Sequence, residues 1–258
     1  MSAFFKIKTY LNYWLDAVDE HSLHAPFLFD FYTRVIKREA IPVSKFESLR
    51  KQLANDHREI EVKDLGAGSK HLASNLRKIS DIASLSLSDA KFSALYARIA
   101  AYCKAKTIVD LGTSLGINTL YLATQPGSKV YTFEGAETIA EIASISFEFG
   151  EAKNIELITG NIDQTLYATL SRIPKIDLAF LDANHRYEPT LRYFELVVSR
   201  SHHKTIIILD DIHDSPEMER AWSAIKNNPL VYTTADLFRC GLVFLDPSLS
   251  KQHVVLHF

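Results

Sequence analysis

Apolar residues in the first 60 positions recur at the spacing of helices. The stretch from 4 to 19 places five of them on one helical face: Ile7, Leu11, Trp14, Leu15 and Val18. Two more helices are predicted over residues 27–38 and 43–54, and a proline shortly before each of them breaks the pattern. We therefore interpret residues 1–60 as a helical N-terminal extension. Its many aromatic side chains should pack on the main domain or on a second subunit.

From residue 105 onwards, short apolar runs alternate with helical patterns. The runs predict five buried strands, at residues 107–111, 129–133, 155–159, 176–181 and 205–209. Helices are predicted over 90–105, from 117, over 137–149, over 187–199 and from Ser215-Pro216, where serine can cap the helix and proline can occupy its first position. The chain closes with strands at 231–234, 241–245 and 253–258. This order predicts an α/β fold with a doubly wound, mostly parallel sheet and an antiparallel C-terminal edge.

The first of these strands leads into a glycine turn and a helix. Gly112 and Gly116 bracket the turn, and helical spacing of apolar residues begins at Ile117. Such a turn lets a ligand approach bare backbone at a helix N-terminus. The next strand ends in Glu134, about twenty residues past the first glycine, which is the distance at which an acid can meet the ribose of a bound nucleotide.

The segment Asp110-Leu-Gly-Thr-Ser-Leu-Gly116, followed by Glu134, resembles the first two motifs of the class I S-adenosylmethionine-dependent methyltransferases. The resemblance implies a Rossmann-like fold, in which the turn holds the methionine end of the cofactor and the acid holds the ribose hydroxyls. The cofactor-binding residues expected on this basis are Asp110, Gly112, Thr113, Gly116, Glu134, Asn161 and Asp182. The alternative to a cofactor site is a buried strand and helix whose glycines have no role in binding.

A second glycine-rich stretch, Asp64-Leu-Gly-Ala-Gly-Ser69, competes with this motif. Only residues 60–62 precede it as strand material, and the polar segment 70–89 is predicted to be helical, with no second strand that ends in an acid. We therefore interpret Gly66 and Gly68 as part of a loop that does not bind the methionine end of the cofactor. Residues 61–104 as a whole are predicted to lead into a catalytic domain over 105–258, and the glycine-rich loop is a candidate lid.

Polar residues gather at the predicted carboxyl ends of the strands, where ligands bind in open α/β sheets. They are Asp110, Glu134, Asn161, Asp182, Asp210 and Asp211. A single acid at such a position commonly just caps a turn. Several acids that converge repel one another, and this repulsion is costly without a cation.

Two of these strand ends, Asp182-Ala-Asn-His185 and Asp210-Asp211, resemble the catechol-type small-molecule O-methyltransferases. The resemblance implies that Asp182, Asp210 and Asp211 hold a divalent cation such as Mg²⁺ and that His185 takes the proton of the acceptor hydroxyl. Asp211 stands where that family usually has Asn, and His185 stands where it has Lys. A metal-free enzyme would use Asp182 or His185 alone, and the structural alternative makes these residues strand caps and surface loops.

Composition narrows the classes of partner. The formal net charge is −2 and no basic cluster occurs, which argues against nucleic acid as a partner. No apolar run is long enough to cross a bilayer, and the two cysteines are too few for a disulfide framework. We therefore expect a cytoplasmic protein that acts on a small molecule without a membrane partner. The aromatic N-terminal helices are a candidate homodimer interface.

Together these patterns predict an S-adenosylmethionine-dependent methyltransferase that acts on an oxygen of a small molecule, with divalent-metal assistance as an option. The alternatives are a metal-independent methyltransferase that acts on another atom and a non-catalytic scaffold with the same fold. A Rossmann oxidoreductase is disfavoured because no G-x-G-x-x-G pattern follows the first strand of the core.

Overall fold

The structure, a computed structural model, describes residues 3–39, 41–62 and 75–258. The chain divides into two compact units. The central unit comprises residues 39–174, and the terminal unit comprises residues 1–38 and 175–258. The predicted division into segments 1–60, 61–104 and 105–258 stays a prediction.

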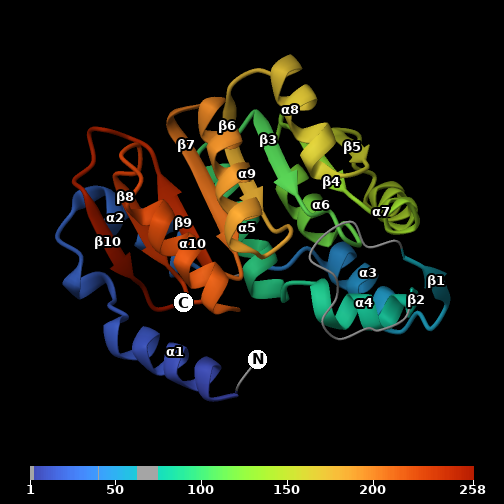
Figure 1. Ribbon diagram of the computed structural model, residues 1–258, viewed down its shortest axis with the longest axis horizontal. Helices are drawn as coiled ribbons and strands as arrows, with labels where there is room; N and C mark the ends of the chain where they lie inside the picture. Colours follow the sequence, from blue (N-terminus) through green and yellow to red (C-terminus); the bar gives the residue numbers. More distant parts are fainter. Residues whose placement is uncertain (1–2, 40, 63–74) are drawn as a thin grey trace. The chain divides into compact units, whose positions relative to one another are not determined.

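The central unit contains three parallel strands of the main sheet, with helices around them, and a separate pair of short strands (Figure 1). Its strands are β1 (Glu59–Glu61), β2 (Leu76–Lys78), β3 (Thr107–Leu111), β4 (Lys129–Glu134) and β5 (Ile155–Thr159). Its helices are α3 (Ser44–Ala54), α4 (Ile79–Ser86), α5 (Ala90–Tyr102), α6 (Ile117–Ala123), α7 (Glu137–Gly150) and α8 (Ile162–Arg172). Strands β3, β4 and β5 pair in parallel, with Asp110 beside Thr132 and Glu134 beside Thr159, whereas β1 and β2 form a separate antiparallel pair. The parallel register brings the carboxyl ends of β3 and β4 to one edge.

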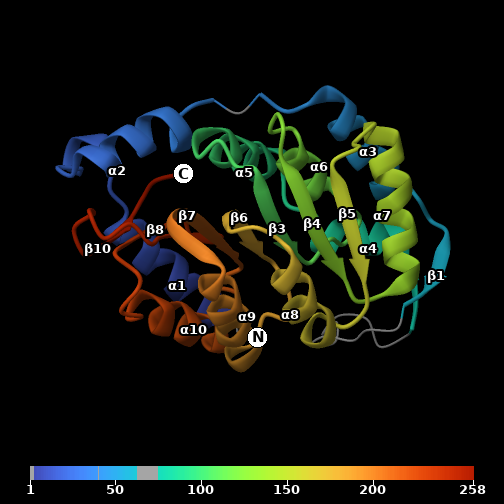
Figure 2. The ribbon, with the colours of Figure 1, turned by 90° about the horizontal axis from the view of Figure 1, so that it is seen from above.

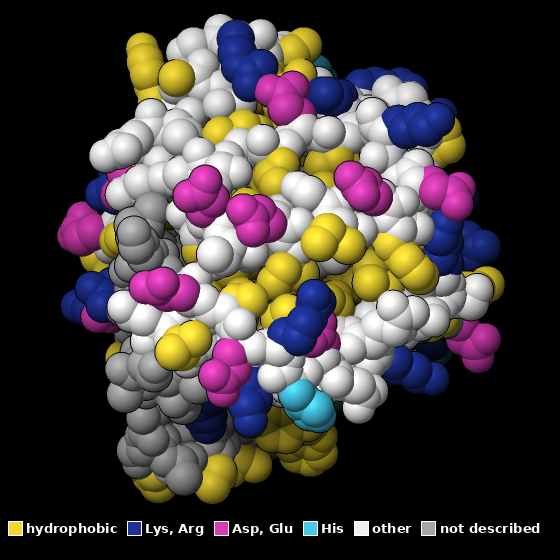
Figure 3. All heavy atoms as spheres, turned by 90° about the vertical axis from the view of Figure 1, so that its right-hand side faces the viewer, with side chains coloured by type: hydrophobic (Ala, Val, Ile, Leu, Met, Phe, Trp, Pro, Cys, Tyr) yellow, Lys and Arg dark blue, Asp and Glu magenta, His cyan; other side chains and the backbone are white. Residues whose placement is uncertain are grey.

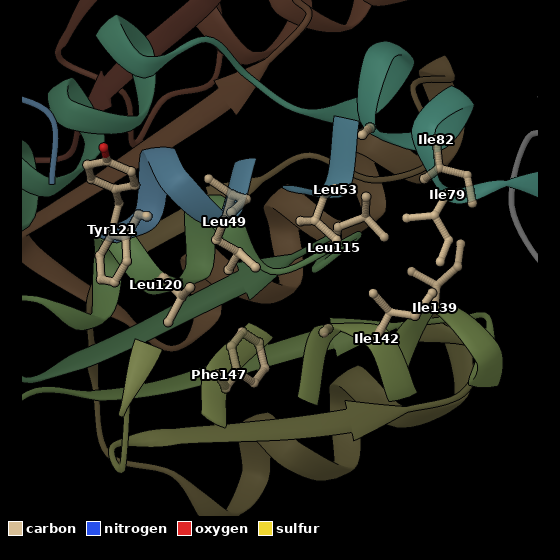
Figure 4. Packing of buried hydrophobic residues seen from close by; sticks show 14 of the residues in the cluster. Leu49, Leu53, Ile79, Ile82, Leu115, Leu120, Tyr121, Ile139, Ile142 and Phe147 are labelled. Atoms are coloured by element: carbon tan, nitrogen blue, oxygen red, sulfur yellow. The ribbon is translucent and has the colours of Figure 1, made fainter. Parts of the chain in front are cut away.

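The core of the central unit lies between α3, α4, α6 and α7. Figure 4 shows side chains of these helices and of the glycine turn pointing toward one another, among them Leu49, Ile79, Leu120 and Ile142. Tyr121 adds a polar anchor, because its hydroxyl donates to the Glu47 carboxylate at 2.8 Å and accepts from a backbone amide of the segment before α3 at 3.0 Å. Helix α6, which begins at the glycine turn, is thereby fixed from both an apolar and a polar side.

One face of this unit carries exposed apolar side chains. Seen from the side on which α7 and β5 lie, hydrophobic and acidic side chains are interspersed (Figure 3). On α7, Ile145 is 60% exposed and Phe149 is 36% exposed. Scattered apolar residues of this kind are normal on protein surfaces and imply no partner.

The terminal unit contains the strands from β6 to β10, with helices beside them (Figure 2). Its strands are β6 (Ile176–Leu181), β7 (Ser201–Asp210), β8 (Thr233–Asp236), β9 (Cys240–Phe244) and β10 (Gln252–Val255). Its helical elements are α1 (Ala3–Asp16), η1 (Glu20–Ser22), α2 (Pro26–Phe31), η2 (Tyr32–Ile36), α9 (Tyr187–Ser199) and α10 (Pro216–Lys226). Strand β7 pairs in parallel with β6 and antiparallel with β9, β9 pairs antiparallel with β8, and β8 pairs in parallel with β10.

The fold class predicted from the sequence is confirmed, including the antiparallel strands at the C-terminal edge. The five predicted parallel strands all form, and α9 spans the predicted range. Three elements were not predicted: the short 3₁₀ helix η1, helix α8, and the short strand β2 inside the segment 70–89 expected to be helical. Gly66 and Gly68 lie outside the described residues. No helix in the described part of the chain has the length and apolar character needed to span a membrane.

Ser215 offers a direct test of the predicted start of α10. Its hydroxyl accepts a hydrogen bond from the Met218 amide at 3.1 Å, and Pro216 follows it in the helix. Ser215→Ala leaves that amide without its cap and should lower the free energy of unfolding by about 1 kcal/mol. Urea unfolding should show this loss, and Ser215→Asp should show much less of it. Equal stability of the alanine variant and the wild type would contradict the capping role.

Candidate functional site

The glycine turn connects β3 to α6 through backbone in the left-handed region. Gly112, Ser114 and Gly116 have φ values of 105°, 47° and 87°. A Cβ at Gly116 would lie 2.8 Å from the Phe147 ring, so the turn needs glycine there both for its backbone conformation and for space. The amides of Gly112 and Thr113 both donate to the Phe133 carbonyl, at 3.1 and 3.0 Å. These bonds hold the turn against the end of β4.

Glu134 closes the turn from the neighbouring strand. One carboxylate oxygen accepts from the Ser114 amide at 2.9 Å, and the other accepts from the Ala136 amide at 3.0 Å. A carboxylate has about four lone-pair positions, so two backbone bonds leave acceptor capacity for hydroxyl groups of a ligand. The acid predicted for ribose binding thus lies beside the glycine turn, as the sequence reasoning requires.

Asp110 lies in β3, two residues before Gly112, and is fully buried. One of its oxygens accepts from the hydroxyls of Thr119 at 2.6 Å and Thr132 at 2.7 Å, while Oδ1 has no hydrogen-bond partner in the described part of the chain. Burial raises the pKa of this carboxyl to about 6, although the two threonine hydroxyls act in the opposite direction. Asp110 therefore links α6 to β4 next to the turn, and its predicted contact with the cofactor stays a prediction.

Asn161 follows β5 and serves as the cap of α8. Its side-chain oxygen accepts from the Asp163 amide at 2.9 Å. The capping bond uses one acceptor position of the amide group and none of its donors. The predicted role of Asn161 in cofactor binding is compatible with this bond and remains untested.

In the terminal unit, the ends of β6 and β7 bring Asp182, His185 and Asp211 together. One ligand-type atom from each lies within 4.8 Å of the others. His185 Nε2 is 3.3 Å from a carboxylate oxygen of Asp182. Asn184 and Asp211 have φ values of 63° and 54°, a conformation that non-glycine residues rarely adopt. Backbone strain of this kind clusters at functional sites.

The charges in this cluster are strongly coupled to one another. Burial, followed by the negative charge of Asp210, raises the pKa of Asp182 to about 7. Burial alone would lower the pKa of His185, but the hydrogen bond and charge of Asp182 outweigh it and raise that pKa to about 9. Burial and Asp210 also raise the pKa of Asp211. Carboxylates that resist ionisation in this way favour a positively charged partner among them.

Asp210 is the member of the predicted metal set that the structure places differently. It is fully buried, and the Arg239 guanidinium donates to both of its oxygens over 3.0–3.3 Å. Asp210 is outside the group formed by Asp182, His185 and Asp211. Its role as a metal ligand stays a prediction, while its negative charge contributes to the raised pKa of Asp182 and of Asp211. Sequence reasoning missed Arg239, which lies 29 positions away and carries no local signal.

Comparison with known proteins supports the interpretation of these motifs. Residues 109–212 match the sequence model of a family described as a methyltransferase domain. The likeness to a methyltransferase domain thus extends from β3 to the end of β7. No curated protein sequence matches the chain.

Solved methyltransferases share the fold of this domain. An O-methyltransferase from Bacillus cereus, in complex with SAH, is 18% identical with a TM-score of 0.59, over 84% of this chain and 97% of that one. TomG from Streptomyces achromogenes, an O-methyltransferase of tomaymycin synthesis in complex with SAM, is 21% identical with a TM-score of 0.55, over 62% of this chain and 82% of that one. At these identities the likeness shows the fold.

The buried Asp110 should make the stability of the protein depend on pH. Because the folded pKa of about 6 exceeds the usual 3.8, the folded state holds this proton more tightly than the unfolded state does. The resulting stabilisation is present below about pH 4 and is lost as the pH rises through 6. It amounts to on the order of 3 kcal/mol.

Asp110→Asn removes this titration and keeps an oxygen that can accept from the two threonine hydroxyls. Urea unfolding at pH 4.5 and pH 7 should therefore show a smaller loss of stability in the variant than in the wild type. Other titrating groups are common to both proteins and cancel in the comparison. The same pH dependence in both would contradict the raised pKa of Asp110.

Proposed function

We propose that the protein is an S-adenosylmethionine-dependent methyltransferase that transfers the methyl group to an oxygen of a small molecule. The observation that carries the proposal is the glycine turn of Gly112–Gly116, braced by the carboxylate of Glu134. The O-methyltransferases from Bacillus cereus and Streptomyces achromogenes with the same fold are in complex with SAH and SAM. Their cofactors support the same assignment here.

The cofactor would be held by the central unit. The open backbone between Gly112 and Gly116 suits its methionine end, and the remaining acceptor positions of Glu134 suit the ribose hydroxyls. The bound sulfonium supplies an activated methyl group. The protein's task is then to align an ionised nucleophile with that group, and alignment contributes to rate without covalent catalysis.

Activation of the acceptor hydroxyl is assigned to Asp182, His185 and Asp211. Two carboxylates and an imidazole can hold a divalent cation, and the raised pKa values of both acids fit a site that gains from added positive charge. A cation bound there would lower the pKa of an acceptor hydroxyl. The imidazole makes Mn²⁺ or Zn²⁺ as suitable as Mg²⁺, which prefers oxygen ligands.

A metal-independent enzyme is the second candidate, and the direct Asp182–His185 ion pair favours it. With its pKa raised to about 9, His185 is protonated at neutral pH and must give up that proton before it can act as a base. In its protonated form it would instead stabilise an ionised acceptor oxygen. Both versions place His185 at the reacting hydroxyl.

The cofactor assignment predicts the behaviour of two Glu134 variants. Calorimetry with S-adenosylhomocysteine should show binding to the wild type, and Glu134→Ala should weaken it by roughly 1–3 kcal/mol for each charge-assisted hydrogen bond that is lost. Glu134→Gln keeps one acceptor oxygen and should lose less. Unchanged affinity in the alanine variant would remove Glu134 from the site, and no binding to the wild type would overturn the proposed function.

The acceptor assignment predicts that His185→Ala slows methyl transfer at saturating cofactor while leaving the affinity for S-adenosylhomocysteine unchanged. A general acid–base group contributes roughly 10²–10⁴-fold to rate. Turnover of S-adenosylmethionine with a panel of phenolic and catecholic acceptors measures this effect. A wild type that binds the cofactor and transfers no methyl group to any acceptor would favour the non-catalytic scaffold.

The metal assignment is tested separately by thermal melting. Excess Mn²⁺ or Mg²⁺ should raise the melting temperature of the wild type by mass action, and Asp211→Asn should reduce that response. Asp210→Asn tests whether Asp210 binds the cation, because the structure pairs Asp210 with Arg239. A response to the cation reduced as much as in Asp211→Asn would indicate a ligand, and a smaller reduction would indicate a neighbouring charge. If a chelator changes neither activity nor melting temperature, the metal-independent mechanism holds.

A further inference from the structure

A cavity of about 560 Å³ opens beside Asp211, within the terminal unit. Ligand pockets for small molecules commonly have volumes of about 300–1,000 Å³. Its lining comes from three parts of the sequence: α1 with Ile7, Tyr10 and Leu11, the segment after β7 with Asp211, and the segment after β8 with Phe238. It therefore joins the N-terminal helix, to which no motif assigns a role, to a residue of the acid cluster.

The two sides of the cavity are held together by specific contacts. Lys6 Nζ lies 3.3 Å from a carboxylate oxygen of Asp214. The Tyr10 ring meets the Phe238 ring edge-on, with 5.1 Å between centroids, and Phe238 stacks on the His213 ring at 5.5 Å. Helix α1 is thus attached to the wall that carries Asp211 through both charge and aromatic contacts.

The position of Phe238 is fixed by its backbone. Its φ is 66°, and its amide donates to an Asp236 carboxylate oxygen at 2.8 Å. The same carboxylate receives His213 Nε2 at 2.8 Å through its other oxygen. A ring held in this way presents a constant apolar surface to the cavity.

The cavity is chemically divided. Asp211 supplies a carboxylate from the β7 side, whereas Ile7, Tyr10 and Leu11 supply an apolar wall from α1. These three residues of α1 are 60%, 51% and 51% exposed, so each has apolar surface that a bound molecule can cover. An acceptor with its hydroxyl toward Asp211 would place the rest of its body against α1.

We propose that α1 is the specificity wall of the acceptor pocket, and that Leu11 and Ile7 select acceptors whose part remote from the methylated hydroxyl is apolar. The proposal rests on the proposed function, since it assumes that the acceptor hydroxyl lies at the acid cluster. It gives the N-terminal extension a role in choosing the substrate and leaves the chemistry to the strand ends.

The chain offers a matched pair of variants on this helix. Leu11 lines the cavity, whereas Leu15, one turn further along α1 and 70% exposed, does not. The probes are catechol and 2,3-dihydroxynaphthalene, which share a pair of hydroxyls and differ in the size of their apolar body. Calorimetry in the presence of S-adenosylhomocysteine measures the binding of each probe without requiring turnover.

The wild type should bind the naphthalene diol more tightly than catechol. Leu11→Ser should raise the Kd for the naphthalene diol on the order of tenfold, the scale of one or two methylene contacts in an apolar pocket. The same variant should change catechol binding much less, and Leu15→Ser should change neither. Unchanged binding of S-adenosylhomocysteine in both variants shows that the fold and the cofactor site are intact.

Several outcomes would overturn the inference. The inference fails if Leu11→Ser and Leu15→Ser have equal effects. It also fails if the wild type does not prefer the naphthalene diol to catechol, or does not bind the naphthalene diol at all. Size-exclusion chromatography adds another: if both variants convert a dimer into monomers, the α1 face is an interface between copies. If Leu11→Ser alone weakens binding of the naphthalene diol but the wild type transfers no methyl group, the pocket stands and the proposed function fails. If the wild type transfers methyl groups but Leu11→Ser and Leu15→Ser behave alike, the proposed function stands and the role of α1 fails.

Discussion

Carboxylates at the ends of parallel strands have to be compensated where water is excluded, and the local architecture is arranged around that requirement. Each acid has a different kind of partner. Two threonine hydroxyls serve Asp110, two backbone amides serve Glu134, a guanidinium serves Asp210 and an imidazole serves Asp182. Glu134 accepts only neutral amide bonds there and keeps acceptor positions that a ligand can use, whereas both oxygens of Asp210 accept from the guanidinium. The way in which the charge is compensated thus differs from one acid to the next.

The sequence was most informative where local chemistry decides the structure. The parallel strands are short apolar runs, and Ser215-Pro216 starts a helix because serine accepts from a backbone amide and proline suits the first turn. Helix α8 carries apolar residues at helical spacing, Ile162, Leu166 and Leu170, so its sequence did hold a signal that the prediction passed over. Strand β2 has only three residues and depends on β1 for its hydrogen bonds, so its own sequence carries little signal. A short strand that is stabilised mainly by its partner strand is difficult to predict from its own sequence.

The candidate site divides in the same way. The glycine turn and Glu134 were identified from spacing, because a fixed strand–turn–helix unit sets the distance between them. The sequence predicted that Asp182, Asp210 and Asp211 converge as metal ligands with His185 as the base, and the structure groups Asp182 and Asp211 with His185. The position of Asp210 was not, because its partner Arg239 comes from the segment between β8 and β9. No pattern along the chain indicates which of two adjacent acids a distant arginine will take, and α1 as a wall of the cavity depends on tertiary contacts in the same way.

The two amide bonds to Glu134 have a consequence for the thermodynamics of ligand uptake. They tie the turn after β3 to the end of β4 through the chain's own hydrogen bonds. A loop fastened in this way has few conformations to lose when a molecule settles on it, so less of the binding free energy is spent on ordering the backbone. Preorganisation of the turn therefore contributes to its affinity for a ligand. Glu134, which would bind the ribose, is also the residue that keeps the turn rigid.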